Sequence, residues 1–203
     1  MSIDVKISKK PVNYHEAITF LENKVIEIND NKSNELIWIL EHPSIFTVGK
    51  SYKSTDIIDK SINLIETSRG GKITWHGPGQ LICYFAIDLN KRGKDIRKFI
   101  NTIENTIIDT LNYFNINSKS DRKNIGIWVN SDKKIAAIGI RVKKWIAYHG
   151  FSININNNLD EYKKIIPCGL KNKSVTNLKN VKNQDYSKIN KIIIKNFLKN
   201  LKI

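Results

Sequence analysis

Apolar residues recur at helical spacing in several parts of the chain, with polar residues on the opposite face. Asn13 and Asp95 stand where a side chain can cap the first turn, and Glu16 completes a capping-box-like pattern with Asn13. Pro167 ends a shorter apolar segment because proline cannot continue a helix. We therefore expect helices at residues 14–29, 96–114, 159–165 and 186–201.

Other segments show the runs that are typical of β-strands. Residues 36–40 form a continuous apolar run, as in a strand buried on both faces, and residues 80–89 give the strongest strand signal in the chain. A polar turn at residues 130–133 predicts a hairpin. The expected strands are residues 36–40, 45–48, 62–65, 72–75, 80–89, 125–129, 134–142 and 145–155. Strands with few βαβ alternations, and helices near the ends, predict an α+β fold. We expect one domain, residues 1–203, with a largely antiparallel or mixed β-sheet layered with helices.

Residues 69–80 crowd four glycines, an arginine and a histidine into twelve positions of a chain with 10 glycines in all. Glycine at this density indicates backbone that passes close to another group or adopts positive φ. Two tight turns around a short strand would explain the glycines alone. Arg69 and His76 favour a ligand-binding loop, because a turn needs neither a fixed cation nor a titratable ring.

The 203-residue chain carries a formal net charge of +15, which favours an acidic partner. Part of that charge reflects heavy use of lysine throughout, and without a base-reading helix or stacking motif we expect no nucleic-acid binding. No run approaches the ~18 apolar residues of a membrane span, and the first residues lack a signal-peptide layout. We therefore expect a cytoplasmic protein without membrane contact. Cys83 and Cys168 lack metal-ligand spacing and should be free thiols, so no metal is expected.

Cys168 and Lys134 are the candidate reactive pair. Cys168 lies between proline and glycine, and an unassisted thiol with a pKa of about 8.5 is only slightly ionised at neutral pH. A lysine ammonium about 4 Å from the sulfur would contribute roughly 4 kcal/mol at an effective dielectric near 20, against about 1.36 kcal/mol per pKa unit. Lys134 opens an apolar strand beside small residues. From spacing alone two alternatives stay open: Cys168 is an inert buried cysteine, and Lys134 is one more surface lysine.

Residues 69–80, Arg-Gly-Gly-Lys-Ile-Thr-Trp-His-Gly-Pro-Gly-Gln, resemble the signature Arg-Gly-Gly-x-x-Thr-[Tyr/Trp]-His-Gly-Pro-Gly-Gln of the lipoyl(octanoyl) transferases, often called LipB. Further segments match that family in order: residues 40–49, 134–141, 149–154, and 167–169 with Thr176 and Leu178. The related lipoate and biotin ligases share the fold but adenylate their acid with ATP. The Pro-Cys-Gly segment, in a chain without a phosphate-binding loop, favours acyl transfer over adenylation.

The resemblance implies the fold of the biotin/lipoate protein ligase catalytic domain and a two-step octanoyl transfer. Cys168 would attack the thioester of octanoyl-acyl carrier protein, with Lys134 lowering its pKa and moving protons. The acyl group would then pass to a lysine of the lipoyl domains of 2-oxoacid dehydrogenases and of the glycine cleavage H protein. No cofactor is implied, and we expect a monomer. An ATP-dependent lipoate- or biotin-type ligase, or a basic nucleic-acid-binding domain, are the alternatives.

The same resemblance assigns substrate binding to three segments, whose apolar members would line a channel for the eight-carbon tail. Backbone N–H groups near Gly150 or Cys168 would stabilise the oxyanion. His149 is a candidate accessory residue, and we expect it and His76 to position substrate by hydrogen bonds, whereas His15, His42 and Cys83 are expected to be structural. The substrate-binding residues are Arg69, Gly70, Gly71, Lys72, Ile73, Thr74, Trp75 and His76; Ala137, Ile138 and Gly139; and Gly150, Phe151 and Ser152.

Overall fold

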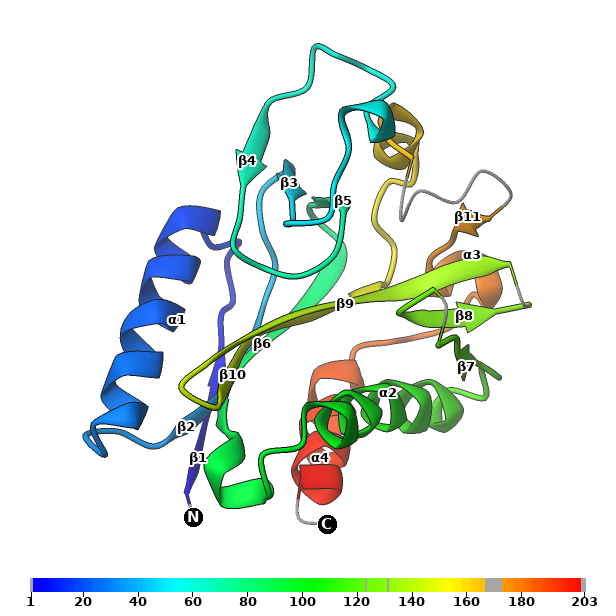
Figure 1. The fold of residues 1–203 in the computed structure, drawn as a ribbon. Helices are drawn as coiled ribbons and strands as arrows, with labels where there is room; N and C mark the ends of the chain where they lie inside the picture. The colour runs from blue at the N-terminus through cyan, green and yellow to red at the C-terminus, as the bar shows by residue number, and fades with distance from the viewer. Residues whose placement is uncertain (1, 123, 131, 167–172, 202–203) are drawn as a thin grey trace.

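The molecule is built on a main β-sheet accompanied by a smaller one (Figure 1). The computed structural model describes residues 2–122, 124–130, 132–166 and 173–201. Paired strands of the main sheet are antiparallel except β1–β2 and β9–β11, which are parallel. In spatial order the main sheet consists of β1 (Ile3–Ile7), β2 (Glu35–Leu40), β6 (Gln80–Asp88), β10 (Ile146–Asn154), β9 (Lys133–Lys143), β8 (Ile127–Val129) and β7 (Lys119–Ser120), with β11 (Ser174–Val175) beside β9.

Helices cover both faces of the main sheet. Helix α1 (Tyr14–Asn29) packs on one face, and α2 (Ile96–Tyr113) and α4 (Ile189–Leu201) pack together on the other (Figure 1). Strand β6 contributes Cys83 and Phe85 to the α2–α4 side and Ile82 and Tyr84 to the α1 side. Because both faces are covered, this strand is apolar at successive positions instead of alternating. None of the described helices is long and apolar enough to cross a membrane.

The smaller sheet encloses a separate apolar cluster. Its strand order is β4 (Leu64–Glu66), β3 (Ile45–Val48) and β5 (Ile73–His76), with β3–β4 parallel and β3–β5 antiparallel. The cluster consists of Phe46, Val48, Ile73, Trp75, Tyr162 and Ile165, so it joins this sheet to the 3₁₀ turn η3 (Asp160–Lys164). The remaining short elements are η1 (Ser54–Asp56), η2 (Leu89–Arg92) and α3 (Leu178–Val181).

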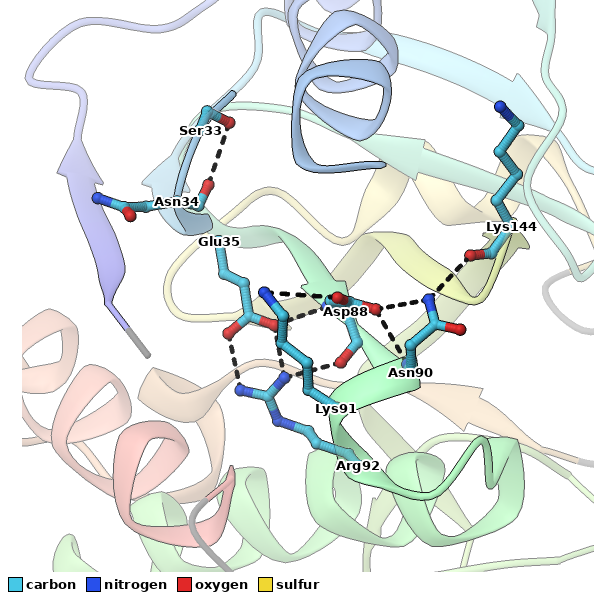
Figure 2. Close-up of polar contacts among 8 residues, drawn as sticks. All are labelled: Ser33, Asn34, Glu35, Asp88, Asn90, Lys91, Arg92 and Lys144. Atoms are coloured by element: carbon cyan, nitrogen blue, oxygen red, sulfur yellow. Dashed lines mark hydrogen bonds and ion pairs between the residues drawn. The ribbon is translucent and has the colours of Figure 1, made fainter. Parts of the chain in front are cut away.

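A buried ion pair fastens the start of β2 to the turn that follows β6. Arg92 donates through both terminal nitrogens to the carboxylate of Glu35, with 2.7 Å between Nη2 and Oε2. The same carboxylate accepts the backbone N–H of Asp88 at 2.7 Å (Figure 2). Glu35 is 2% exposed, so the cation and the backbone donor must offset the desolvation of its charge.

The predicted fold class is confirmed, while several predicted elements need correction. The caps are as expected, because Asn13 accepts from the N–H of His15 and Asp95 from that of Lys98. The short helix predicted at 159–165 is present as a 3₁₀ helix at Asp160–Lys164, and the weak strand predicted at 62–65 is displaced to 64–66. The last helix begins at Ile189, not at 186, and the strand predicted from 125 begins at Ile127. Strands β1, β7 and β11 and helix α3 were not predicted, because they are short or, in β1, largely exposed.

Candidate functional site

A cavity of about 430 Å³ lies where the main sheet, the smaller sheet and the loop at residues 69–72 meet. Its walls come from β5, β6, β9 and β10, and alanine, isoleucine, valine and phenylalanine side chains line much of it. Arg69, His76, Lys134 and His149 add polar groups. This volume and lining are typical of small-molecule sites. Within the described part of the chain, no three His, Cys, Asp or Glu side chains are grouped as a metal ion would require.

The structure brings nearly all of the predicted site residues with described positions to this one cavity. Trp75 is the exception, because it packs in the small-sheet cluster and its Nε1 donates to Ser44 Oγ at 2.9 Å. Thr74 and His76, its neighbours along β5, line the cavity as the alternation of a strand requires. The residues that line the cavity are Arg69, Gly70, Gly71, Lys72, Ile73, Thr74, His76, Lys134, Ala137, Ile138, Gly139, His149, Gly150, Phe151 and Ser152.

Lys134 is held in the cavity wall at the start of β9. Its side chain is buried, its Nζ donates to the Ile125 carbonyl at 2.7 Å, and Nζ lies 5.4 Å from the centre of the Trp128 ring. Gly126 makes room for it, since a β-carbon there would overlap Lys134 Cε. The ammonium therefore has a defined position in a largely apolar wall.

Cys168 lies outside the described residues, as do Pro167 and Gly169, but the chain on both sides of them is placed. On one side, Ile165 bridges to Ile57 and the N–H of Ile166 donates to the Asp56 carbonyl at 2.7 Å. On the other, Val175 of β11 pairs with Lys134. Tyr162 and Val175, which flank the segment, both line the cavity.

Arg69 ties the glycine-rich loop to β3. Its guanidinium donates to the Thr47 carbonyl at 2.8 Å and to Thr47 Oγ1 at 3.0 Å, and also to the Gly70 carbonyl. The N–H of Gly70 donates to the Ile140 carbonyl of β9 at 3.2 Å. The loop therefore bridges the two sheets over the cavity.

His76 is buried at the end of β5 and contacts Gln80, with 2.7 Å between Nδ1 and Oε1. Burial, the nearby His42 ring and Arg69 lower the pKa of His76 to about 3, although the Gln80 contact acts in the opposite direction. The ring is neutral at physiological pH, so it can orient a ligand by hydrogen bonding without carrying charge.

His149 has an unusual backbone for a residue in the middle of a strand. Its φ is +67°, in the left-handed region, and its ring stacks on that of Tyr148 with 4.8 Å between centroids. Ala147 and Phe151 face the α2–α4 side, so regular alternation would turn His149 there as well; instead its ring stacks on Tyr148, which packs on the α1 side. Burial, Arg69 and Arg141 lower the pKa of His149 to about 3.

Tyr14, Tyr84, Tyr162 and Asn154 also line the cavity and were not predicted to do so. Tyr14 and Tyr84 follow the apolar periodicity of their elements, which makes them indistinguishable from core residues in the sequence. His42 is fully buried, with Nδ1 2.7 Å from the Val12 carbonyl and Nε2 2.9 Å from the Tyr84 hydroxyl, as expected of a structural histidine. Cys83 lies in the core of β6, where burial raises the pKa of its thiol.

Sequence comparison identifies close relatives over most of the chain. The family described as lipoyl protein ligase A/B catalytic domain matches residues 13–198. An octanoyltransferase from Wolbachia sp. subsp. Brugia malayi (strain TRS) is 45% identical over 177 residues, which cover 85% of this chain and 86% of the relative. An octanoyltransferase from Ehrlichia canis (strain Jake) is 40% identical over 201 residues, covering 96% and 94% respectively.

Solved structures share the fold at low sequence identity. A putative lipoate protein ligase from T. acidophilum with bound lipoic acid has a TM-score of 0.77 at 15% identity, covering 100% of this chain and 87% of that one. The biotin protein ligase from Aquifex aeolicus in complex with biotin and ATP has a TM-score of 0.57 at 14% identity, covering 98% and 70%. The predicted likeness to the biotin/lipoate ligase fold is therefore confirmed. By its sequence relatives, the chain belongs to the octanoyltransferases, acyltransferases of the lipoyl protein ligase A/B family.

Proposed function

We propose that the protein transfers an octanoyl group from octanoyl-acyl carrier protein to a lysine of a lipoyl domain, through a thioester on Cys168. The acceptors are the lipoyl domains of 2-oxoacid dehydrogenases and the glycine cleavage H protein. One observation supports this most directly: Lys134 stands in the wall of a cavity that is also lined from both sides of the segment carrying Cys168. The relatives named octanoyltransferase support the octanoyl group as the cargo.

In the first step, the Cys168 thiolate attacks the carbonyl carbon of the octanoyl thioester. A carbon–sulfur bond to Cys168 forms, the bond to the carrier sulfur breaks, and the carrier leaves as a thiol after taking up a proton. Lys134 has two roles: its ammonium favours the thiolate electrostatically, and it supplies the proton to the leaving sulfur. Its burial and its hydrogen bond to Ile125 keep the charge in one place.

In the second step, the neutral amine of the acceptor lysine attacks the acyl-enzyme. A carbon–nitrogen bond forms, the bond to Cys168 breaks, and the proton lost by the amine returns to Lys134. The two thioesters are similar in energy and the amide is lower, so division into two steps keeps each barrier modest.

The cavity and the surface charge suit these substrates. Ile73, Ile138 and Phe151 offer apolar walls to an octanoyl tail, and burial of each methylene contributes about 0.8 kcal/mol. The formal net charge of +15 favours approach of acidic carrier and lipoyl domains, because opposite charge accelerates encounter.

Intact-mass measurement after incubation with octanoyl-acyl carrier protein tests the proposal. We expect the wild type and Cys83→Ala to gain one octanoyl group and Cys168→Ala to gain none, because Cys83 is buried in β6. A wild type that gains no octanoyl mass contradicts the proposal. The ATP-dependent ligase makes the opposite prediction: free octanoate with ATP would modify a lipoyl domain, whereas we expect no product from that mixture.

A further inference from the structure

A buried chain of side-chain hydrogen bonds connects the His76 ring to the chain that follows Cys168. Gln80 is completely buried; its Oε1 lies 2.7 Å from His76 Nδ1, and its Nε2 donates to Asn154 Oδ1 at 2.8 Å. Asn154 in turn donates from Nδ2 to the carbonyl of Thr176 at 2.9 Å. Thr176 directly follows β11, and its N–H donates to the Lys134 carbonyl at 2.9 Å.

This chain fixes the orientation of every group in it. The Thr176 carbonyl can only accept, so the Asn154 amide must turn its nitrogen to Thr176 and its oxygen to Gln80. Gln80 must then present its nitrogen to Asn154, an orientation that the Trp75 carbonyl, 3.4 Å from Nε2, also requires. Gln80 Oε1 is left facing His76, and an amide oxygen only accepts. The hydrogen of the neutral His76 ring is therefore on Nδ1, which makes Nε2 a hydrogen-bond acceptor.

We propose that Gln80 is a positioning residue that holds His76 as the Nδ1–H tautomer, so that His76 Nε2 accepts a hydrogen bond from a substrate N–H group in the cavity. This inference rests on the proposed function, which supplies two N–H groups. One is the attacking amine of the acceptor lysine, and the other is an amide N–H of the arm that carries the donor thioester. The neutral state of His76 supports the assignment, because an imidazolium has no lone pair to offer.

Two substitutions at Gln80 separate positioning from a structural role. Gln80→Met keeps the length but cannot accept from Nδ1, so we expect a mixed tautomer and a roughly tenfold or greater loss in the step that uses Nε2. Gln80→Glu still presents an oxygen to Nδ1, and its second oxygen can keep a proton and donate it to Asn154 Oδ1, as the Gln80 amide does. We therefore expect Gln80→Glu to keep the Nδ1–H tautomer and most of the rate that Gln80→Met loses. Gln184→Met is the matched control, because it removes an amide that donates to Phe114 outside the cavity.

The measurements are long-range ¹H–¹⁵N spectra of the histidine rings and the rates of the two half-reactions. His76→Asn identifies the His76 signals, which we expect to show Nδ1–H and an unprotonated Nε2. Slower acylation of Gln80→Met assigns the N–H to the carrier arm, and slower transfer from octanoyl-enzyme assigns it to the lysine amine. A wild-type Nε2–H tautomer, or Gln80→Met rates equal to those of Gln184→Met, overturns the inference. The tautomer is readable even if no octanoyl-enzyme forms, so a failure of the proposed function is distinguishable.

Discussion

The side chain of Lys134 occupies the space that a β-carbon on Gly126 would fill. A carbon placed there would overlap Lys134 Cε and lie 2.6 Å from the Ala136 carbonyl oxygen and 3.0 Å from Nζ, and the φ of Gly126 is +138°. The Lys134 side chain can therefore take this position only because residue 126 has no side chain.

We expect Gly126→Ala to slow octanoylation of Cys168, because it displaces the Lys134 ammonium. A misplacement of about 1 Å at a reacting group costs up to roughly a hundredfold in rate. Gly93→Ala is the control: its φ is also positive, at +82°, but nothing lies within 4 Å of the added carbon. Mass-based acylation rates and urea unfolding of both variants are the measurements. Equal acylation rates for the two would show that Gly126 does not act through Lys134.

Lys134→Met removes the charge and keeps much of the buried volume. If Lys134 is the cation that favours the thiolate, Cys168 reverts to a thiol pKa of about 8.5, and acylation at pH 7 should fall by at least about thirtyfold. About thirtyfold of that loss should return as the pH approaches 9, while the loss of the proton donor persists. Lys133→Met, at the exposed neighbouring position of β9, should leave the rate unchanged. A ratio of Lys134→Met to wild-type rates that does not rise between pH 7 and 9 would mean that the charge of Lys134 is not what activates the sulfur.

Stability should decrease in mild acid because of buried histidines. Burial lowers the pKa of His42, and those of His76 and His149 fall to about 3. An unfolded histidine takes up its proton near pH 6.5, so below that pH the unfolded state binds more protons than the folded state. The free energy of unfolding should then fall by about 1.4 kcal/mol per pH unit for each such ring. Urea midpoints between pH 7.5 and 5 measure the slope, and His76→Asn should reduce it; an unchanged slope would contradict this origin.

The backbone of His149 predicts an inverted order of glycine and alanine. In a regular strand or helix, glycine is less stable than alanine by roughly 0.5–1 kcal/mol, but at a positive φ the β-carbon is penalised by about 1–2 kcal/mol. His149→Gly should therefore unfold at a higher urea concentration than His149→Ala. Asn23 is the control, because it is exposed and lies within the regular helix α1. There we expect the usual order, with Asn23→Ala more stable than Asn23→Gly. The same order at both positions would argue against a left-handed His149.

The ion pair between Glu35 and Arg92 predicts that a second substitution at Glu35 restores stability lost by a substitution at Arg92. Arg92→Met leaves the buried Glu35 carboxylate without its cation and should cost about 3–5 kcal/mol. Adding Glu35→Gln should recover more than half of that loss, because a neutral amide oxygen still accepts the Asp88 N–H. Acylation rates should stay at wild-type level, since neither residue is among those that line the cavity. Additive losses in urea unfolding would show that the pair is not coupled.

Local sequence patterns predicted the features that depend on one element. The spacing within residues 14–29 and the cap at Asn13 involve neighbours along the chain, and both are confirmed. The two-sided burial of β2 was visible in residues 36–40 as a continuous apolar run. The weak strand near 64–66 was misplaced because Leu64 and Ile65 are only partly buried, Glu66 is exposed, and three residues carry little pattern.

Contacts between different elements could not be predicted in the same way. Gly126 opposite Lys134, and Tyr84 against His42, depend on how strands align, which no local pattern records. The left-handed φ of His149 could not be predicted either, because histidine, unlike glycine, rarely adopts a positive φ and so gives no sign of it in the sequence. Gln80 belongs to the glycine-rich signature, yet its buried contact with His76 is visible only in the structure.

The chain is attached through its backbone on each side of the stretch that carries Cys168: Ile165 bridges to Ile57, which follows η1, and β11 pairs with β9 of the main sheet. Both attachments are made by backbone hydrogen bonds, so neither depends on which side chains the residues between them carry. The side chains between these two attachments can therefore differ without loss of the backbone hydrogen bonds that hold the flanking chain. A shared architecture for acyl transfer and for ligases that bind ATP, such as the biotin ligase, becomes understandable on that basis.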